Sequence, residues 1–287
     1  MSASFPTRPY GNTGVHLSIL GFGGIVVMNA EQAHANRVVA EAVERGINYF
    51  DVAPSYGNAE EKLGPALEPF RKNVFLACKT GKRDKAEAKQ ELQNSLERLH
   101  TDYFDLYQLH ALYDKDVDSV FMKGGAIEAL AEARASGQVR YLGFSAHSAK
   151  AAVTAMERFP FDSVLFPTNF VTYHKTNFGP TVLKKAQELG VARLALKAMA
   201  HQAWCENHPH REQYKKCWYE PLTNPHHAQL ALRWTLSQPI TAAVSPGEEA
   251  LLRMAMDIVS DYEPITEAET TELLGLVDSA DPIFPDA

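Results

Sequence analysis

Several polar side chains of this sequence stand where apolar runs end, and their types suit proton transfer. Asp51 ends the run INYFD and Lys79 ends the run NVFLACK. His110 ends the run DYFDLYQLH, and Tyr56 follows Asp51 within the stretch FDVAPSYG. A buried carboxylate requires a cation or several donors, because burial otherwise raises its pKa until it is neutral. We therefore expect Asp51 to pair with Lys79.

These four residues could protonate a carbonyl oxygen. The phenol of free tyrosine has a pKa of about 10, so it is a poor proton donor near neutrality. An ammonium group beside the ring stabilises the phenolate and lowers that pKa, a role that suits Lys79 beside Tyr56. His110 could donate to the same carbonyl oxygen and orient it. None of the four can supply a hydride, so a reduction at this site implies a nicotinamide cofactor.

The elements that must position these residues follow a regular alternation. Apolar runs typical of buried strands lie at 18–24, 47–52, 73–79, 102–110, 139–146, 162–169, 192–199 and 240–245. Segments with helical spacing lie at 32–45, 58–68, 84–99, 125–136, 148–158, 180–189, 225–237 and 248–260. Such alternation implies parallel strands joined by right-handed crossovers, with both sheet faces buried. We predict an α/β fold, a (β/α)8 TIM barrel, with a doubly wound open sheet as the alternative.

Two further elements flank this pattern. Turn residues in RPYGNTGVHLS predict a small N-terminal β-hairpin, and the stretch 264–280 predicts an extra C-terminal helix with Thr266 as its N-cap. Asn224 before Pro225 is typical of a helix start, and Gly190 of a helix end. No linker rich in Gly, Ser or Pro interrupts the chain, so we expect one domain over 1–287. In a barrel the strand ends share one face, so the four polar residues should converge.

The composition excludes several classes of protein. Hydrophobic residues make up 45% and charged residues 22%, a balance typical of soluble globular proteins. A net charge of −7 without a Lys/Arg-rich run gives no sign of a nucleic-acid partner. Three cysteines indicate reduced thiols, and no signal peptide or membrane-spanning run is seen. We expect a cytoplasmic protein without a membrane partner, and nothing indicates its oligomeric state.

Five stretches of the sequence resemble a known family in order and spacing: YGNTGVHLSILGFGG (10–24), FDVAPSYG (50–57), CKT (78–80), DYFDLYQLH (102–110) and GFSAHS (143–148). They are similar to the aldo-keto reductase superfamily, of the prokaryotic type, over almost the whole chain. The resemblance implies a (β/α)8 barrel that reduces an aldehyde or ketone with NADP(H) or NAD(H). It also implies that Tyr56 is the general acid, tuned by Lys79 and Asp51, and that His110 orients the carbonyl.

The cofactor positions implied by the resemblance differ from the family's pattern. The family places a Ser-Asn pair after the fifth strand, whereas here Ser145 is followed by Ala146. A glutamine is expected near Leu165, and Asn169 could serve instead. In the family an aromatic residue after the seventh strand stacks on the nicotinamide, whereas here that position falls near Leu196 or Lys197.

The loop after the eighth strand also departs from the family's pattern. Gly247 suits a phosphate at a helix N-terminus, but Glu248 and Glu249 stand where cations for a 2′-phosphate are expected. Carboxylates can instead accept from ribose hydroxyls, so the choice between NADP(H) and NAD(H) stays open. The expected cofactor contacts are Gly23, Gly24, Ser145, Asn169, Leu196, Lys197, Gly247 and Arg253.

The substrate is expected to be a small-molecule carbonyl compound with apolar or aromatic character. Loops after the strands supply apolar and aromatic candidates for the pocket: Ile25, Met28, Pro54, Tyr173, Trp204, Trp218 and Phe284. The stretch 201–223 is too long for an ordinary connection, and loops of that length are usually functional. It holds Cys205, Cys217, His208 and His210, whose spacing matches no familiar zinc site.

Two other functions are compatible with the same fold. Histidines lie at or just past the ends of strands four to seven, namely His110, His147, His174 and His201. A metal-dependent barrel hydrolase holds zinc in this way, but usually also has His-x-His on the first strand and an acid on the eighth. Here those strands end in GFGG and AVSP. The second alternative is a redox-sensing subunit that binds the cofactor with little turnover.

Overall fold

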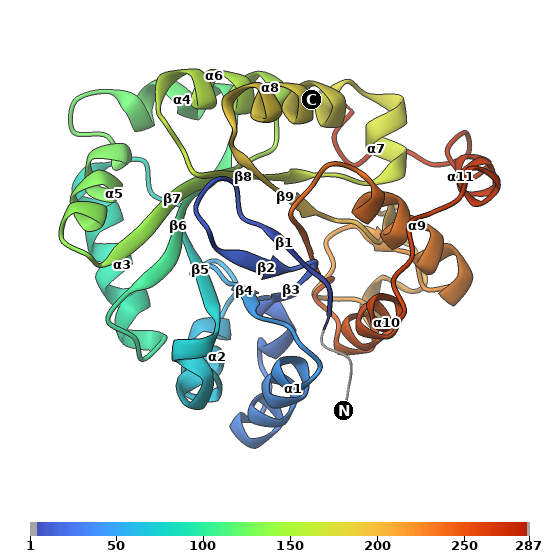
Figure 1. Cartoon of the computed structure of the whole chain (residues 1–287), viewed down its shortest axis with the longest axis horizontal. Helices are drawn as coiled ribbons and strands as arrows, with labels where there is room; N and C mark the ends of the chain where they lie inside the picture. The colour runs from blue at the N-terminus through green and yellow to red at the C-terminus, as the bar shows by residue number, and fades with distance from the viewer. Residues whose placement is uncertain (1–4, 286–287) are drawn as a thin grey trace.

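The centre of the computed structural model, which describes residues 5–285, is a closed barrel of eight parallel strands (Figure 1). Around the barrel the strands follow the order β12-β3-β4-β5-β6-β7-β8-β9. Their bounds are β3 (Leu20–Gly23), β4 (Tyr49–Asp51), β5 (Phe75–Thr80), β6 (Phe104–Leu112), β7 (Val139–Ala146), β8 (Ser163–Pro167), β9 (Ala192–Leu196) and β12 (Ala242–Val244). Each falls within or overlaps one predicted apolar run. The TIM-barrel prediction is confirmed, and the open-sheet alternative is wrong.

The eight predicted helices surround the barrel. They are α1 (Gln32–Glu44), α2 (Ala59–Leu67), α3 (Lys85–Arg98), α5 (Ala126–Ala135), α6 (Ala149–Arg158), α8 (Phe178–Leu189), α9 (Pro225–Ser237) and α10 (Glu249–Ser260). The capping chemistry explains where some of them begin and end. Asn224 accepts from the backbone N–H of His227 at 3.1 Å, which caps α9. Gly190 ends α8 with a φ of 69°, a left-handed conformation that glycine adopts without strain.

Some helices were absent from the prediction, and one was predicted too long. The helices α4 (Asp114–Phe121) and α7 (Phe170–Lys175) follow β6 and β8, and 3-10 turns lie at η1 (Gly24–Val27), η2 (Glu68–Asn73) and η3 (Arg211–Gln213). The final helix α11 (Glu267–Leu274) is shorter than the predicted stretch 264–280. It does begin at the predicted N-cap, because Thr266 and Glu269 form a capping box.

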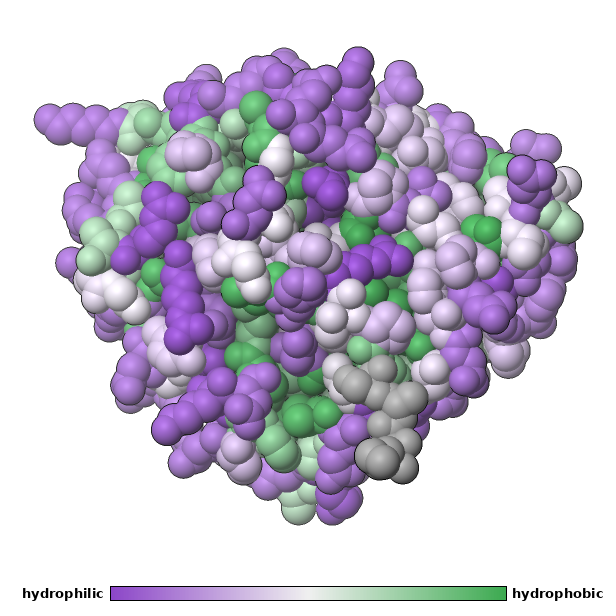
Figure 2. Space-filling view, in the orientation of Figure 1, coloured by the Kyte–Doolittle hydropathy of each residue, from purple (hydrophilic) through white to green (hydrophobic). Residues whose placement is uncertain are grey.

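The predicted N-terminal hairpin closes one end of the barrel. Its strands are β1 (Thr7–Pro9) and β2 (His16–Ser18), and in Figure 1 it crosses the centre of the ring of strands. The fully buried Tyr10 donates its hydroxyl to Ser163 Oγ at 2.8 Å, at the start of β8, and its ring packs on Phe75 at 5.1 Å. Figure 2 shows this face covered by largely hydrophilic side chains. The opposite end, where the strands finish, is therefore the end available for a site.

The apolar residues form two main layers. Inside the barrel, Tyr49, Leu106, Leu165 and Leu194 pack with the hairpin residues above them. A larger layer fills the space between the strands and the surrounding helices. None of the helices within residues 5–285 has the length and apolarity needed to cross a bilayer.

Candidate active site

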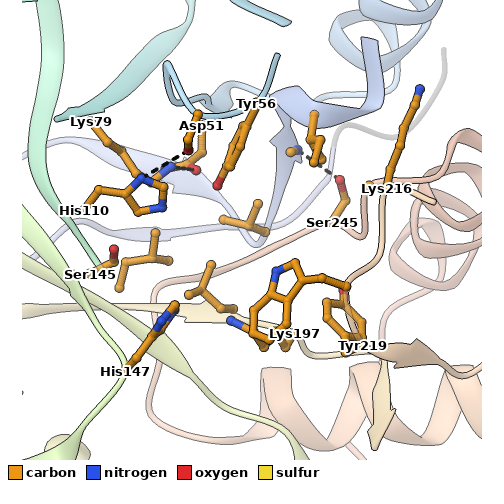
Figure 3. Close-up of a pocket in the computed structure, with 18 residues that line it drawn as sticks. Asp51, Tyr56, Lys79, His110, Ser145, His147, Lys197, Lys216, Tyr219 and Ser245 are labelled. Carbon is orange, nitrogen blue, oxygen red and sulfur yellow. Dashed lines mark hydrogen bonds and ion pairs between the residues drawn. The ribbon is translucent and has the colours of Figure 1, made fainter. Parts of the chain in front are cut away.

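A cavity of about 350 Å³ lies at the carboxyl ends of the barrel strands. Its walls include all four residues singled out for proton transfer, Asp51, Tyr56, Lys79 and His110 (Figure 3). Ligand pockets span about 300–1,000 Å³, so this cavity is among the smaller ones.

Asp51 and Lys79 form a buried ion pair at the base of the cavity. Asp51 ends β4 opposite Ala77 of β5, and Lys79 lies two residues further along the same face. The Lys79 ammonium pairs with Asp51 Oδ1 and donates to the carbonyl oxygen of Val52 at 3.3 Å. Each of the two residues exposes only 1% of its surface. The carboxylate at the end of this apolar strand therefore has its cation.

Two further donors satisfy Asp51. Gln108 Nε2 donates to Oδ2 at 3.0 Å, and the Tyr49 hydroxyl donates to the same oxygen at 3.2 Å. Neither residue was predicted from the sequence. Tyr49 lies two positions before Asp51 on the same strand face, and Gln108 is a polar residue within an apolar strand, opposite Lys79 in register. That polar interruption was the available signal for Gln108.

The ionisation of the site follows from burial and from this ion pair. Burial alone would lower the pKa of Lys79, but the Asp51 carboxylate and the Tyr56 phenol raise it above its ordinary value. Burial raises the pKa of the Tyr56 phenol, and the Lys79 cation offsets that rise only in part. The expected lowering by Lys79 is present, but burial outweighs it, so the pKa of Tyr56 lies above that of a free tyrosine rather than below it. Near neutrality Lys79 is an ammonium and Tyr56 carries its proton.

His110 lies at an irregularity in β6 that directs its side chain. The pairing of β6 with β7 changes register between Leu109 and Leu112, and Ala111 has a φ of 52°. Arg83 donates to the carbonyl oxygens of His110 and Ala111 at 2.8 and 3.1 Å. These contacts fix the conformation in which the His110 ring meets the Tyr56 ring edge to face at 6.0 Å. Arg83 was missed because its contact depends on this bulge.

His110 is a neutral imidazole in this environment. Burial lowers the pKa of His110 well below its usual value, and the Lys79 cation lowers it further. One ring nitrogen, Nδ1, lies 3.5 Å from Ser55 Oγ. A neutral imidazole keeps one N–H donor, which could serve a carbonyl oxygen in the cavity.

The expected cofactor contacts divide into two groups. The cavity is lined by Gly23, Ser145, Leu196, Lys197 and Gly247. Gly24, Asn169 and Arg253 are not among its lining residues. Asn169 instead caps α7, where its Oδ1 accepts from the backbone N–H of Thr172 at 2.8 Å. A side chain at Gly24 would meet Val52 Cβ at 2.8 Å, which shows how tightly this glycine packs on β4.

Arg253 lies on the outside of α10. Its guanidinium group donates to Glu249 Oε1 at 2.6 Å and to Glu41 Oε2 at 2.9 Å. Glu249 also contacts His34 Nε2 at 2.5 Å. Two carboxylates therefore already neutralise the arginine that was expected to meet the cofactor.

Only two of the residues expected to contact the substrate line the cavity, Ile25 and Trp218. Tyr173 packs against Trp234, with ring centroids 5.1 Å apart. Trp204 donates its indole N–H to the carbonyl oxygen of Cys217 at 2.8 Å. Neither Met28, which packs against the core, nor Pro54 belongs to the wall. Phe284 is not a wall residue either, and its ring lies 4.8 Å from that of His147.

The long segment 201–223 folds over the mouth of the barrel. The strands β10 (Ala200–Gln202) and β11 (Glu220–Pro221) pair at its two ends. It supplies Lys216, Trp218 and Tyr219 to the cavity wall. Lys216 Nζ donates to the carbonyl oxygen of Val26 at 2.6 Å, which holds the segment against the first βα connection. The sequence indicated the functional importance of this segment but not which of its residues face inward.

The strand-end histidines do not converge on a metal site. His110 and His147 line the cavity, whereas His174 packs on Trp234 and His201 lies 3.6 Å from Glu220. Over residues 5–285, no three His, Cys, Asp or Glu side chains are placed to share an ion. The alternative of a metal-dependent hydrolase thus has no ligand set in the part of the chain that the structure describes.

Comparison with known proteins gives a consistent result. A sequence model of the aldo/keto reductase family matches residues 20–269. The chain is 27% identical to the uncharacterized oxidoreductase YqkF of Bacillus subtilis, across 93% of this chain and 94% of that protein. It is 25% identical to the L-galactose dehydrogenase of Arabidopsis thaliana, across 92% of this chain and 89% of that protein. The solved holo form of the aldo-keto reductase AKR11C1 from Bacillus halodurans has the same fold, with a TM-score of 0.75 and 24% identity over 99% of this chain and 100% of that chain.

Proposed function

The chain belongs to the aldo/keto reductase family. On this premise we propose that it reduces an aldehyde or ketone to an alcohol, with NAD(P)H as the hydride donor and Tyr56 as the general acid. One observation carries the assignment of Tyr56. The Lys79 ammonium, held by Asp51, lies 5.3 Å from the centre of the Tyr56 ring, inside the cavity that His110 also lines. A phenol beside a fixed cation can release its proton and be stabilised as phenolate.

The residues around the cavity suit a nicotinamide cofactor. When bound, that cofactor supplies the hydride. Ser145 Oγ accepts from the backbone N–H of Ala111 at 2.7 Å, so its own proton is free to donate to a carboxamide. Leu165 and Leu196 offer apolar surface to a flat ring. The N-terminus of α10 has no side-chain cap, so its backbone N–H groups could bind a diphosphate.

The protein side chains then perform the proton transfer. A carbonyl oxygen between Tyr56 and His110 accepts hydrogen bonds from the phenol and from the neutral imidazole. Reduction at the carbonyl carbon leaves negative charge on this oxygen, which is a far stronger base than a phenolate. The proton of Tyr56 therefore moves to it, even though burial raises the phenol pKa. Lys79 stabilises the phenolate that remains, and Asp51 keeps Lys79 charged.

Turnover of a simple aldehyde tests this function. The purified protein should oxidise NADPH or NADH when a neutral aldehyde such as benzaldehyde is present, with the alcohol formed in equal amount. Consumption of reduced cofactor and formation of benzyl alcohol are the two measurements. Tight cofactor binding without turnover of any aldehyde would instead support the redox-sensing alternative.

We expect NADH to bind at least as tightly as NADPH. The position expected to meet a 2′-phosphate has Glu248 and Glu249, and Arg253 is already paired with Glu249 and Glu41. A phosphate there would meet net negative charge, whereas ribose hydroxyls could donate to a carboxylate. Titration of protein fluorescence with each reduced cofactor measures the two dissociation constants.

A matched pair of variants sharpens the cofactor test. Glu249→Gln removes one carboxylate from Arg253 and should strengthen NADPH binding by about two- to fivefold, the size expected for one partly exposed charge. Glu267→Gln removes the same charge from the exposed start of α11 and should leave both constants unchanged. A strong NADPH preference in the wild type that Glu249→Gln does not alter would place the 2′-phosphate away from these carboxylates.

A further inference from the structure

Lys197 has an unusual position for a lysine. It follows the end of β9, exposes only 7% of its surface and lines the cavity. Figure 3 places Lys197 and His147 across the cavity from Asp51, Lys79 and Tyr56. The backbone at Lys197 has a φ of 63°, a left-handed conformation that non-glycine residues rarely adopt outside functional sites and turns. Its side chain is therefore held inside the site rather than reaching out to solvent.

The surroundings of the Lys197 ammonium group lack a counter-charge. Nζ lies over the ring of Trp218 at 4.5 Å from its centre and over the ring of Phe284 at 5.0 Å. Within residues 5–285 no carboxylate forms an ion pair with it, and no carboxylate acts on its pKa. Aromatic faces compensate a buried cation only in part. An anion from outside the chain would complete this environment.

The charge balance of the cavity favours an anionic ligand. Asp51 is the only carboxylate among the lining residues that the structure describes, and it is paired with Lys79. Lys216 Nζ donates to the carbonyl oxygen of Val26 and has Glu248 and Glu249 as counter-charges, and burial keeps His110 neutral. The positive charge left without a partner is thus concentrated at Lys197, where water is largely excluded and an ion pair is correspondingly strong.

We propose that Lys197 binds a carboxylate of the substrate, so that the carbonyl compounds this enzyme prefers are small oxo acids. This inference rests on the proposed function and names its substrate class. The carboxylate lies at Lys197 and is unchanged in the reaction. The carbonyl group lies at Tyr56, where its carbon gains the hydride as the cofactor is oxidised and its oxygen gains the phenol proton. Solvent then returns that proton to Tyr56.

His147 can support the same carboxylate. Its Nδ1 lies 3.0 Å from the Tyr113 hydroxyl. When that hydroxyl donates to Nδ1, the imidazole carries its proton on Nε2 and offers a second donor in the cavity. Burial, with the Lys197 cation nearby, lowers the pKa of His147 to about 3, so it is neutral near pH 7.

Matched acids and esters test the inference by turnover. The probes are 4-oxobutanoate and 4-carboxybenzaldehyde, each compared with its methyl ester, so that both lengths and an aromatic spacer are sampled. We expect the wild type to prefer the acids. Lys197→Met should lower kcat/KM for the acids by about 10- to 100-fold more than for the matched esters, mainly through KM. Lys197→Arg should retain part of the preference, because it keeps the charge.

The pH dependence supplies a second readout. Burial and the Lys79 cation lower the pKa of Lys197 to about 7. Because the carboxylate requires the ammonium form, kcat/KM for the acid relative to its ester should fall as pH rises above about 7. The pKa values of Lys79 and Tyr56 lie higher, and that of His110 lies well below its usual range. Burial raises the pKa of Cys217 to about 11 and raises the pKa of Tyr219 well above its usual value. Burial lowers the pKa of Lys216.

Variants decide which lysine causes this pH effect. If Lys197 is responsible, the acid-to-ester ratio of Lys197→Met should no longer change with pH. Lys150→Met, which removes an equal charge from a lysine with 81% of its side chain exposed on α6, should behave as the wild type. A pH-dependent ratio that persists in Lys197→Met would assign the anion to Lys216 and overturn the inference.

A binding measurement separates this inference from the proposed function. Calorimetric titration of 4-carboxybenzaldehyde and its methyl ester into the protein without cofactor requires no turnover. If Lys197→Met binds the acid more weakly than the wild type does but binds the ester equally well, the inference is supported. This holds even if no aldehyde is reduced, and in that case only the proposed function fails. If the wild type, Lys197→Met and Lys197→Arg all bind the acid with equal affinity, the inference is wrong, whether or not the protein turns over aldehydes.

Discussion

Replacing Tyr56 with phenylalanine should lower kcat/KM for aldehyde reduction by about 10²- to 10⁴-fold, the range that general acid catalysis contributes. The variant keeps the aromatic ring and the Asp51–Lys79 ion pair but has no proton to give. The affinity for reduced cofactor should therefore change by less than about twofold. Steady-state kinetics with benzaldehyde and fluorescence titration with the cofactor measure the two effects.

A second tyrosine provides the control for the Tyr56 variant. Tyr214 lies in the segment 201–223 but outside the cavity wall, so Tyr214→Phe removes a phenolic hydroxyl without altering the site. Its kinetics should match those of the wild type. If Tyr56→Phe keeps most of the turnover, the acid is another group or water, and the proposed mechanism is wrong.

Replacing Lys79 with methionine should remove activity and also destabilise the fold. Both members of the Asp51–Lys79 pair are buried, so the variant leaves a carboxylate without its cation. Breaking a buried pair in this way costs about 3–5 kcal/mol of stability. Urea unfolding followed by circular dichroism measures the loss of stability. Aldehyde turnover at pH 7 without denaturant measures the loss of activity.

The double variant Asp51→Asn/Lys79→Met separates the two effects of that change. Its neutral asparagine can still accept from Gln108 and Tyr49 through the side-chain oxygen, so most of the lost stability should return. Activity should stay low, because no cation stabilises the phenolate of Tyr56. If the double variant is as unstable as Lys79→Met, the unpaired charge of Asp51 is not the cause of the instability.

The fold could be predicted because its determinants are local. Each barrel strand is buried on both faces, so it appears in the sequence as an apolar run whose neighbours need not be known. The missed helices α4 and α7 have eight and six residues and depend on caps formed by Tyr113 with Asp116 and by Asn169. Short helices draw most of their stability from such contacts and from packing, which periodicity does not reveal.

The residues for proton transfer could be predicted mainly because three of them end strands. Asp51, Lys79 and His110 have this property, and Tyr56 was found through its closeness to Asp51 in the sequence. Lys216 and Tyr219 reach the cavity because of the path of an irregular segment, and Arg83 because of a bulge in β6. The direction of the Tyr56 pKa shift also depended on the balance between burial and one cation, which requires coordinates.

The contacts of the N-terminal hairpin and of β3 determine when the barrel can close during folding. Arg8 donates to the carbonyl oxygens of Leu236 and Ile240, at 2.7 and 2.9 Å, and β3 pairs with β12. Arg8 and β3 thus find these partners more than 200 residues further along the chain. The loop that must be closed is long and closes late. The barrel therefore cannot close until β12 is available to pair with β3.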